Sequence, residues 1–210
     1  MAIRDWLERM TGNGSRGSRT GGHEPPRQPL HEVTARSGRD QVIAYAVRLS
    51  GLALDQPDVH AFYRKTFANH PDQFVTYNDL RKHGDLIDKD ALKALGLRAN
   101  AKLSGQFLAT LNESGRGDPM GAACVIGLTI STALCSWRDL QKASAAKTET
   151  VKFRASNMAA GPCECAASID GARLSIAQAK VLPYEACPHP DQCGCSYQAW
   201  FEFMEGLELD

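Results

Sequence analysis

The chain has 210 residues, enough for one good-sized domain or for a helical domain with a small appendage. Its hydrophobic and charged fractions, 43% and 23%, are ordinary for a soluble globular protein. Its 24 basic and 24 acidic residues cancel to a formal net charge of zero. No whole-protein field therefore draws it to nucleic acid or to an anionic membrane, and we predict no nucleic-acid partner.

The N-terminal region divides into two predicted segments. Residues 1–10 place apolar side chains on one helical face and lack the apolar run of a secretory signal. Ten residues are too few for a stable isolated helix, so we expect a short amphipathic helix that docks on its own domain, on a protein partner or, weakly, on a membrane. Residues 11–39 are rich in Gly, Ser, Arg and Pro and predict a disordered linker. The expected compartment is the cytoplasm, where thiols stay reduced.

Apolar residues at helical spacing predict a helical domain over residues 40–145. Pro57 suits the first position of a helix, and Asp88 and Ser104 suit N-caps. The glycine-rich stretch NESGRGDP follows no strand, so we expect helix-capping chemistry there and no phosphate site.

A long apolar helix is predicted to start at Asp118-Pro119 and to run to about Lys142. Residues 120–137 carry no charge, which is near the lower limit for a membrane span. Their many small residues favour a buried helix that other parts of the protein cover. Cys124 and Cys135 lie on this helix, where we expect them to be buried small hydrophobes.

Beyond residue 148 the pattern changes to a small β module, predicted over residues 148–200 and followed by an acidic tail at 201–210. Val151 and Phe153 alternate with polar residues as in a strand. Asp170-Gly171 suits the two-residue turn of a β-hairpin. The final segment, YQAWFEFMEGLELD, predicts a short amphipathic helix. The expected fold class is α+β, a mainly helical domain followed by a cysteine-rich β-hairpin module.

Six side chains that can bind a metal flank the predicted hairpin. They are Cys163, Cys165, Cys187, His189, Cys193 and Cys195. Zinc takes four thiolate or imidazole ligands in a tetrahedron, and a hairpin whose two ends bring ligands together suits that geometry. Pro188 and Pro190 stiffen the second group of ligands. We therefore expect a structural zinc site that contributes folding energy to the module.

The choice of four ligands among the six stays open, because both cysteine pairs are C-x-C and the usual zinc knuckle is C-x-x-C. A disulfide-linked segment, an iron–sulfur site and a cluster without metal are the alternatives. The sequence lacks the H-x-E and P-C-x-x-C pattern of zinc deaminases. We predict no catalytic or cofactor-binding residue and a protein that is not an enzyme. The alternative is a metal-dependent or cysteine-based enzyme that uses the same cluster.

The segment CECAASIDGARLSIAQAKVLPYEACPHPDQCGC resembles the closing segment of phage Mu F-like head-morphogenesis (minor capsid) proteins. The matching residues are Cys163, Cys165, Asp170-Gly171, His189-Pro190, Cys193 and Cys195. The ending is also similar to that of uncharacterised small bacterial proteins. The first resemblance implies a non-enzymatic assembly function in a phage or prophage head and a location in the virion. Both resemblances imply a compact, cysteine-stapled module.

Overall fold

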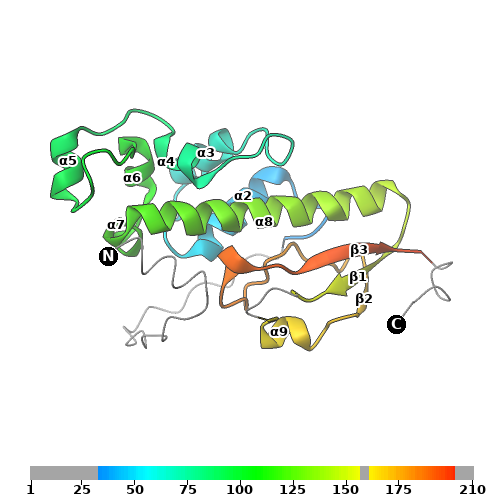
Figure 1. The fold of residues 1–210 in the computed structure, drawn as a ribbon. Helices are drawn as coiled ribbons and strands as arrows, with labels where there is room; N and C mark the ends of the chain where they lie inside the picture. Colours follow the sequence, from blue (N-terminus) through cyan, green and yellow to red (C-terminus); the bar gives the residue numbers. More distant parts are fainter. Residues whose placement is uncertain (1–32, 157–160, 202–210) are drawn as a thin grey trace.

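The computed structural model describes residues 33–156 and 161–201 (Figure 1). Its helices are α2 (Arg39–Ser50), α3 (Pro57–Thr66), α4 (Tyr77–Lys82), α5 (Lys89–Ala94), α6 (Gly105–Thr110), α7 (Glu113–Gly117), α8 (Pro119–Ala145) and α9 (Glu164–Ala167). A 3-10 turn, η1, covers Pro190–Gln192, and the strands are β1 (Thr150–Arg154), β2 (Arg173–Ser175) and β3 (Ser196–Trp200). The predicted α+β class is confirmed. The amphipathic helix predicted at 1–10, the linker up to residue 32 and the tail from 202 lie outside the described residues.

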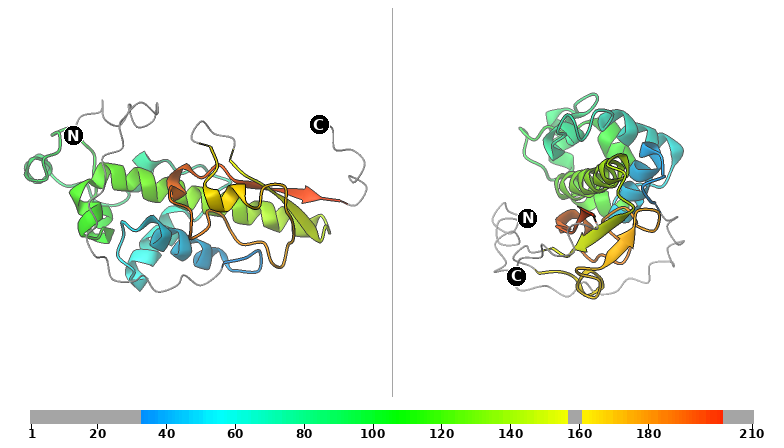
Figure 2. Two further views of the ribbon diagram at one scale, coloured as in Figure 1. Left: turned by 90° about the horizontal axis from the view of Figure 1, so that it is seen from below. Right: turned by 90° about the vertical axis from the view of Figure 1, so that its right-hand side faces the viewer.

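The long helix α8 lies between the other helices and the sheet. Seen along its axis in Figure 2 (right), α8 has the strands on one side, most of the shorter helices on the other, and α2 beside it. It packs against α2, α4, α7, η1 and β3. The buried apolar side chains form one continuous core, which contains Ile43 of α2, Ile130 of α8 and Phe153 of β1. The predicted boundary between a helical domain and a β module is therefore not a boundary between two cores.

The predicted helix starts form by local capping. The side chains of Asp88, Ser104 and Asp118 each accept hydrogen bonds from backbone N–H groups two or three residues further on, at 2.8 to 3.0 Å. A side-chain acceptor at this position satisfies a helical N–H group that has no partner within its own helix. α8 continues to Ala145, about one turn beyond the predicted end.

The predicted linker extends too far along the chain, because residues 33–38 are part of the packed structure. Val33 and Ala35 are 5% and 6% exposed. Two side chains of α8 hold this segment: the indole N–H of Trp137 donates to the Ser37 carbonyl at 3.0 Å, and the Gln141 amide donates to the Ala35 carbonyl. Composition predicted a solvated segment because it contains no information about these donors, which lie about 100 residues away.

The three strands form an antiparallel sheet in the order β2-β1-β3. Val151 pairs with Leu174 on one side and with Ala199 on the other. Val151 and Phe153 are buried as the predicted alternation requires, and Tyr197 of β3 joins them on the face toward α8.

Two predictions for this region need correction. Asp170-Gly171 does form a turn, with Gly171 at φ +75°, but the turn joins α9 to β2 and does not join two strands. The amphipathic helix predicted for the C-terminal segment is wrong at its start, because residues 196–200 are strand β3. Pairing with β1, more than 40 residues earlier, decides the conformation there.

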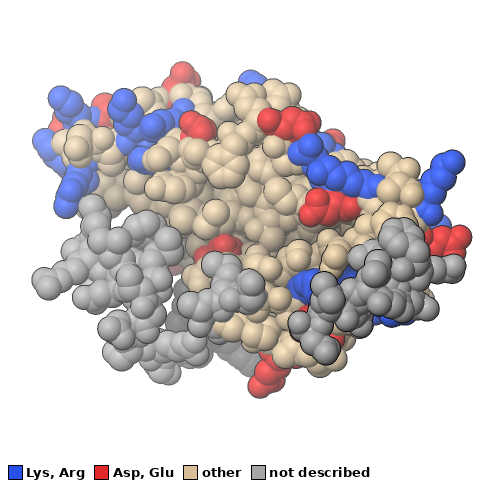
Figure 3. All heavy atoms as spheres, turned by 45° about the vertical axis from the view of Figure 1, so that its right-hand side comes forward, with Lys and Arg blue, Asp and Glu red and all other residues tan. Residues whose placement is uncertain are grey.

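α8 is long and apolar enough to cross a membrane by length and composition, and half of its most apolar stretch is buried inside the protein. Core helices of soluble proteins have the same properties, so this helix alone does not indicate a membrane protein. The face shown in Figure 3 carries both basic and acidic side chains, with uncharged areas between them.

Candidate functional site

The six candidate ligands lie in two segments that flank β2. Cys163 is the N-cap residue of α9, and Cys165 lies inside this short helix. Cys187 and His189 precede η1, and Cys193 and Cys195 lie between η1 and β3. Because β3 is paired with β1, the chain after η1 is carried back toward the segment that follows β1.

The five thiols of this region lie near one another. Cys187 is central, because it accepts from the thiols of Cys193 and Cys163 and from the backbone N–H of His189. Cys163 also contacts Cys165, and Cys193 contacts Cys195. The structure therefore brings all five predicted cysteines together, and all five are free thiols.

Backbone N–H groups reach three of the sulfur atoms. The His189 N–H donates to Cys187, the Cys195 N–H donates to Cys193, and the Ser156 N–H donates to Cys195. The first two bonds span two residues each and thus belong to tight local turns. Such donors favour the thiolate, which is the form that binds a metal.

The thiols have unequal affinities for protons. The hydrogen bond from Cys193 lowers the pKa of Cys187 to about 6, despite partial burial, and the same bond raises the pKa of Cys193. Burial is the main cause that raises the pKa of Cys165 and of Cys195. Cys187 therefore ionises before Cys165, Cys193 and Cys195.

An aromatic cluster supports the loop that carries Cys187. The rings of Phe153 and Tyr184 stack with centroids 5.8 Å apart, and Tyr197 meets Phe153 edge-on at 5.8 Å. The Tyr197 hydroxyl donates to the Lys180 carbonyl at 2.7 Å, so the Tyr184 hydroxyl is the donor in the 2.8 Å bond between the two tyrosines. Sequence reasoning missed this cluster, although the aromatic residues of CSYQAW next to the last cysteines were a signal for it.

The remaining candidates differ from the predictions in part. The His189 side chain is exposed, and the contribution of this residue to the thiol cluster comes from its backbone N–H. Cys135 is exposed, so its prediction as a buried hydrophobe is wrong, and Cys124 is half-buried. Burial is the main cause that raises the pKa of both thiols.

Within residues 33–156 and 161–201, no three or more His, Cys, Asp and Glu side chains form a ready-made metal site. The contacts between the thiols run in a row, from Cys165 through Cys163, Cys187 and Cys193 to Cys195. Two cavities, one lined by residues of α3, α4 and the loop between them and the other by Leu95 and residues of α6 and α7, contain no cysteine. Zinc binding by these residues thus stays a prediction. No protein-family model, curated protein or solved structure matches this chain.

Proposed function

We propose that the protein is a non-enzymatic binding or assembly protein whose C-terminal segment is stapled by a structural zinc ion. The observation that carries the proposal is the convergence of five free thiols from two segments that β2 separates. In a tetrahedral site with Zn–S bonds of about 2.3 Å, the sulfur atoms lie ~3.8 Å apart, close to the contact distance of two thiols. Binding of a zinc ion would rearrange the row of thiols into a tetrahedron.

Three of the ligands follow from the contacts. Cys187 touches both Cys163 and Cys193, so these three sulfur atoms already connect the two segments. Cys195 is the strongest candidate for the fourth position, since it contacts Cys193 and accepts the Ser156 N–H. Cys165 and the imidazole of His189 are the alternatives for that position.

Several features favour a structural role over a catalytic one. Cys163 and Cys195 pack against the hydrophobic core, and the aromatic cluster closes the loop next to them. A metal in this position would hold the segment around α9 against the segment around η1. A closed site of four protein ligands leaves no position for a substrate or for water.

Phage or prophage head assembly is the setting that we propose, on the resemblance of the segment from Cys163 to Cys195 to Mu F-like proteins. An assembly function requires a protein partner, which we propose on the same resemblance. The second candidate, an enzyme that uses this cluster, is favoured by the exposed His189 side chain next to Cys187. An exposed imidazole can leave a metal with an open coordination position.

Metal analysis of the full-length protein, purified under reducing conditions, tests the proposal. We expect about one zinc per chain, bound by four protein ligands. Substitution by cobalt, followed by absorption spectroscopy, counts the thiolates and separates a closed site from one with bound water. A metal-free protein with five reactive thiols contradicts the zinc proposal, and a site with three protein ligands and a water supports the enzyme.

A further inference from the structure

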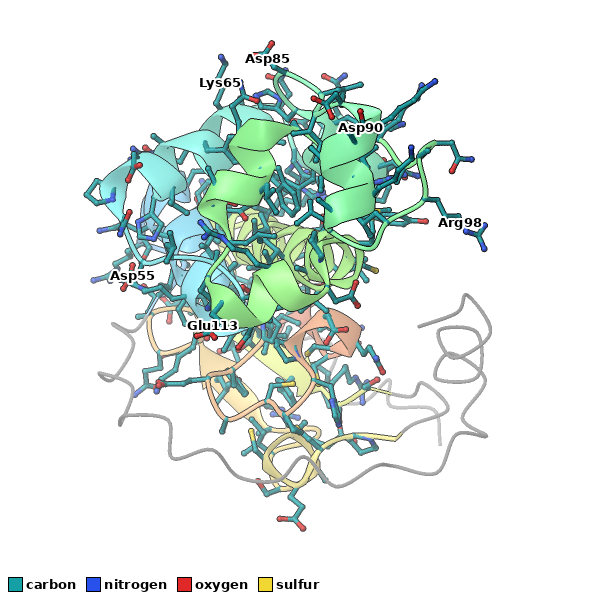
Figure 4. All side chains as sticks on the ribbon, turned by 90° about the vertical axis from the view of Figure 1, so that its left-hand side faces the viewer. Asp55, Lys65, Asp85, Asp90, Arg98 and Glu113 are labelled. Carbon is teal, nitrogen blue, oxygen red and sulfur yellow. The ribbon has the colours of Figure 1, made fainter. Side chains whose placement is uncertain are left out.

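The contact between Cys163 and Cys187 joins the two segments of the thiol cluster. Cys163 lies before β2 and Cys187 lies after it, so the two residues are far apart in the sequence but in contact in the fold. The contact of Cys187 with Cys193, by comparison, stays within one segment. In Figure 4 this part of the molecule lies below the helical part, which carries the labelled charged side chains, and sulfur atoms are drawn in yellow.

Each of the two cysteines is held by its own anchor. Cys163 is the N-cap residue of α9, where its carbonyl accepts the Ala166 N–H at 3.0 Å, and it packs against the hydrophobic core. The Cys187 N–H donates to the Tyr184 carbonyl at 2.9 Å, and the Tyr184 ring stacks on Phe153 of β1. Two different parts of the fold thus keep these free thiols in contact.

We propose that this contact is a site of oxidation by hydrogen peroxide, at which a disulfide between Cys163 and Cys187 replaces the zinc ion as the staple. The inference rests on the proposed function, because it concerns the regulation of the same site. A disulfide forms only between two sulfur atoms that can approach to about 2.05 Å, and the fold already brings these two into contact.

The reaction balances with hydrogen peroxide as the oxidant. One sulfur, as a thiolate, attacks the peroxide, so that the O–O bond breaks and a sulfenic acid and a hydroxide ion form. The second sulfur, also as a thiolate, attacks the sulfenic sulfur, so that the S–S bond forms and the S–O bond breaks with release of a second hydroxide ion. The two sulfur atoms lose two electrons, and the peroxide takes up these electrons and two protons to become two water molecules.

The two staples exclude each other at these sulfur atoms. Zinc binds the thiolate form of cysteine, so a disulfide between Cys163 and Cys187 removes two of the proposed ligands and releases the metal. The disulfide also closes the loop that contains β2, which restricts the unfolded chain. The segment around α9 would therefore stay joined to the segment around η1 in both redox states, by zinc under reducing conditions and by the disulfide under oxidising ones.

Peptide mapping of the full-length protein tests the inference. The protein, purified under reducing conditions, is titrated with hydrogen peroxide and digested without a reductant, and mass spectrometry identifies the joined peptides. We expect the bond between Cys163 and Cys187 within one chain as the main product, together with the loss of two of the seven free thiols and the release of about one zinc per chain. A dithiol reductant should restore the thiols and the metal binding.

A matched pair of variants checks the assignment. Cys163→Ser should lose the product, whereas Cys135→Ser, at the exposed cysteine of α8, should keep it, and circular dichroism checks that both variants keep the fold. The inference is overturned if the unmodified protein joins Cys187 mainly to Cys193, or if its thiols are oxidised without a bond between the two segments.

The metal content is measured before oxidation, so the two proposals fail separately. A metal-free protein that forms the bond between Cys163 and Cys187 contradicts the zinc ion and supports the oxidation site. A zinc-bound protein that does not form this bond supports the zinc ion and overturns the oxidation site.

Discussion

The hydroxyl of Tyr45 on α2 donates to the backbone carbonyl of Pro183, 138 residues further along the chain, at 2.6 Å. Both residues are buried. One residue earlier, the N–H of Leu182 donates to the Ser136 hydroxyl of α8 at 3.0 Å. The loop that leads to Cys187 is thus fixed to the helices by two buried hydrogen bonds, which couple the stability of the two parts.

Tyr45→Phe should destabilise the whole protein. The substitution keeps the packing of the ring but leaves the buried Pro183 carbonyl without its donor, which costs about 1–3 kcal/mol. For a chain of this size, that corresponds to a decrease of several degrees in the melting temperature. Tyr77→Phe, at an exposed tyrosine on α4, is the control and should change little. Thermal unfolding followed by circular dichroism measures both, and equal melting temperatures would contradict the coupling.

Two glycines of the NESGRGDP stretch should respond in opposite ways to alanine. A Cβ at Gly115 would lie 2.3 Å from the Leu52 carbonyl oxygen, whereas a Cβ at Gly117 would meet nothing within 4 Å. Gly115→Ala forces the backbone apart at a buried position, and we expect a loss of about 1–3 kcal/mol. Gly117→Ala should be neutral or stabilise by up to about 1 kcal/mol, because alanine favours the helix. Urea unfolding of the two variants checks the difference, and equal effects would argue against close packing of α7 on Leu52.

Features that depend on neighbouring residues in the sequence could be predicted, and features that depend on distant partners could not. Asp88, Ser104 and Asp118 cap helices by hydrogen bonds to N–H groups two or three residues away. The neighbouring sequence was therefore enough to predict these caps. Strand β3 forms because Trp200 pairs with Thr150, a contact that local periodicity does not encode.

The candidate site shows the same division. The density of cysteines after Cys163 predicted a cluster, and the five thiols do meet. The exposed side chain of His189 was not predictable, because the direction of a side chain depends on backbone angles in a loop. The aromatic support from Tyr184 and Tyr197 was missed, since the two residues meet only after β3 has paired with β1.

Stability should fall in mild acid because of His70. This side chain is buried, and its Nδ1 has no hydrogen-bond partner among the residues that the structure describes. Burial is the main cause that lowers the pKa of His70 below its ordinary value of 6.5. The charges of Arg39 and Arg138 lower this pKa further, and the charge of Asp72 raises it. Below about pH 6.5 the unfolded chain binds a proton at His70 that the folded protein does not bind. The free energy of unfolding therefore falls as the pH decreases.

The expected contribution of this one proton is a slope of up to about 1.4 kcal/mol per pH unit, present between the unfolded and the folded pKa. Urea unfolding at several pH values from 7.5 to 5 measures this slope, because the range includes the ordinary histidine pKa of about 6.5. His70→Gln removes the titrating group and should flatten the profile, whatever its effect on stability at neutral pH. A variant profile as steep as that of the parent protein would assign the acid sensitivity to other groups.

Cys187→Ser should remove the zinc that we propose and loosen the C-terminal segment. Cys187 connects Cys163 to Cys193, so its loss separates the two groups of thiols, and bound metal should fall from about one zinc per chain to well below half. Amide hydrogen exchange should then accelerate in β3 and in the loop before it, and a chelator added to the parent protein should do the same. Cys135→Ser, at the exposed cysteine of α8, is the matched control and should keep the metal and the slow exchange. If both variants keep their metal, then the site lies elsewhere; if Cys187→Ser loses the metal while exchange in β3 stays slow, then the ion does not staple the fold.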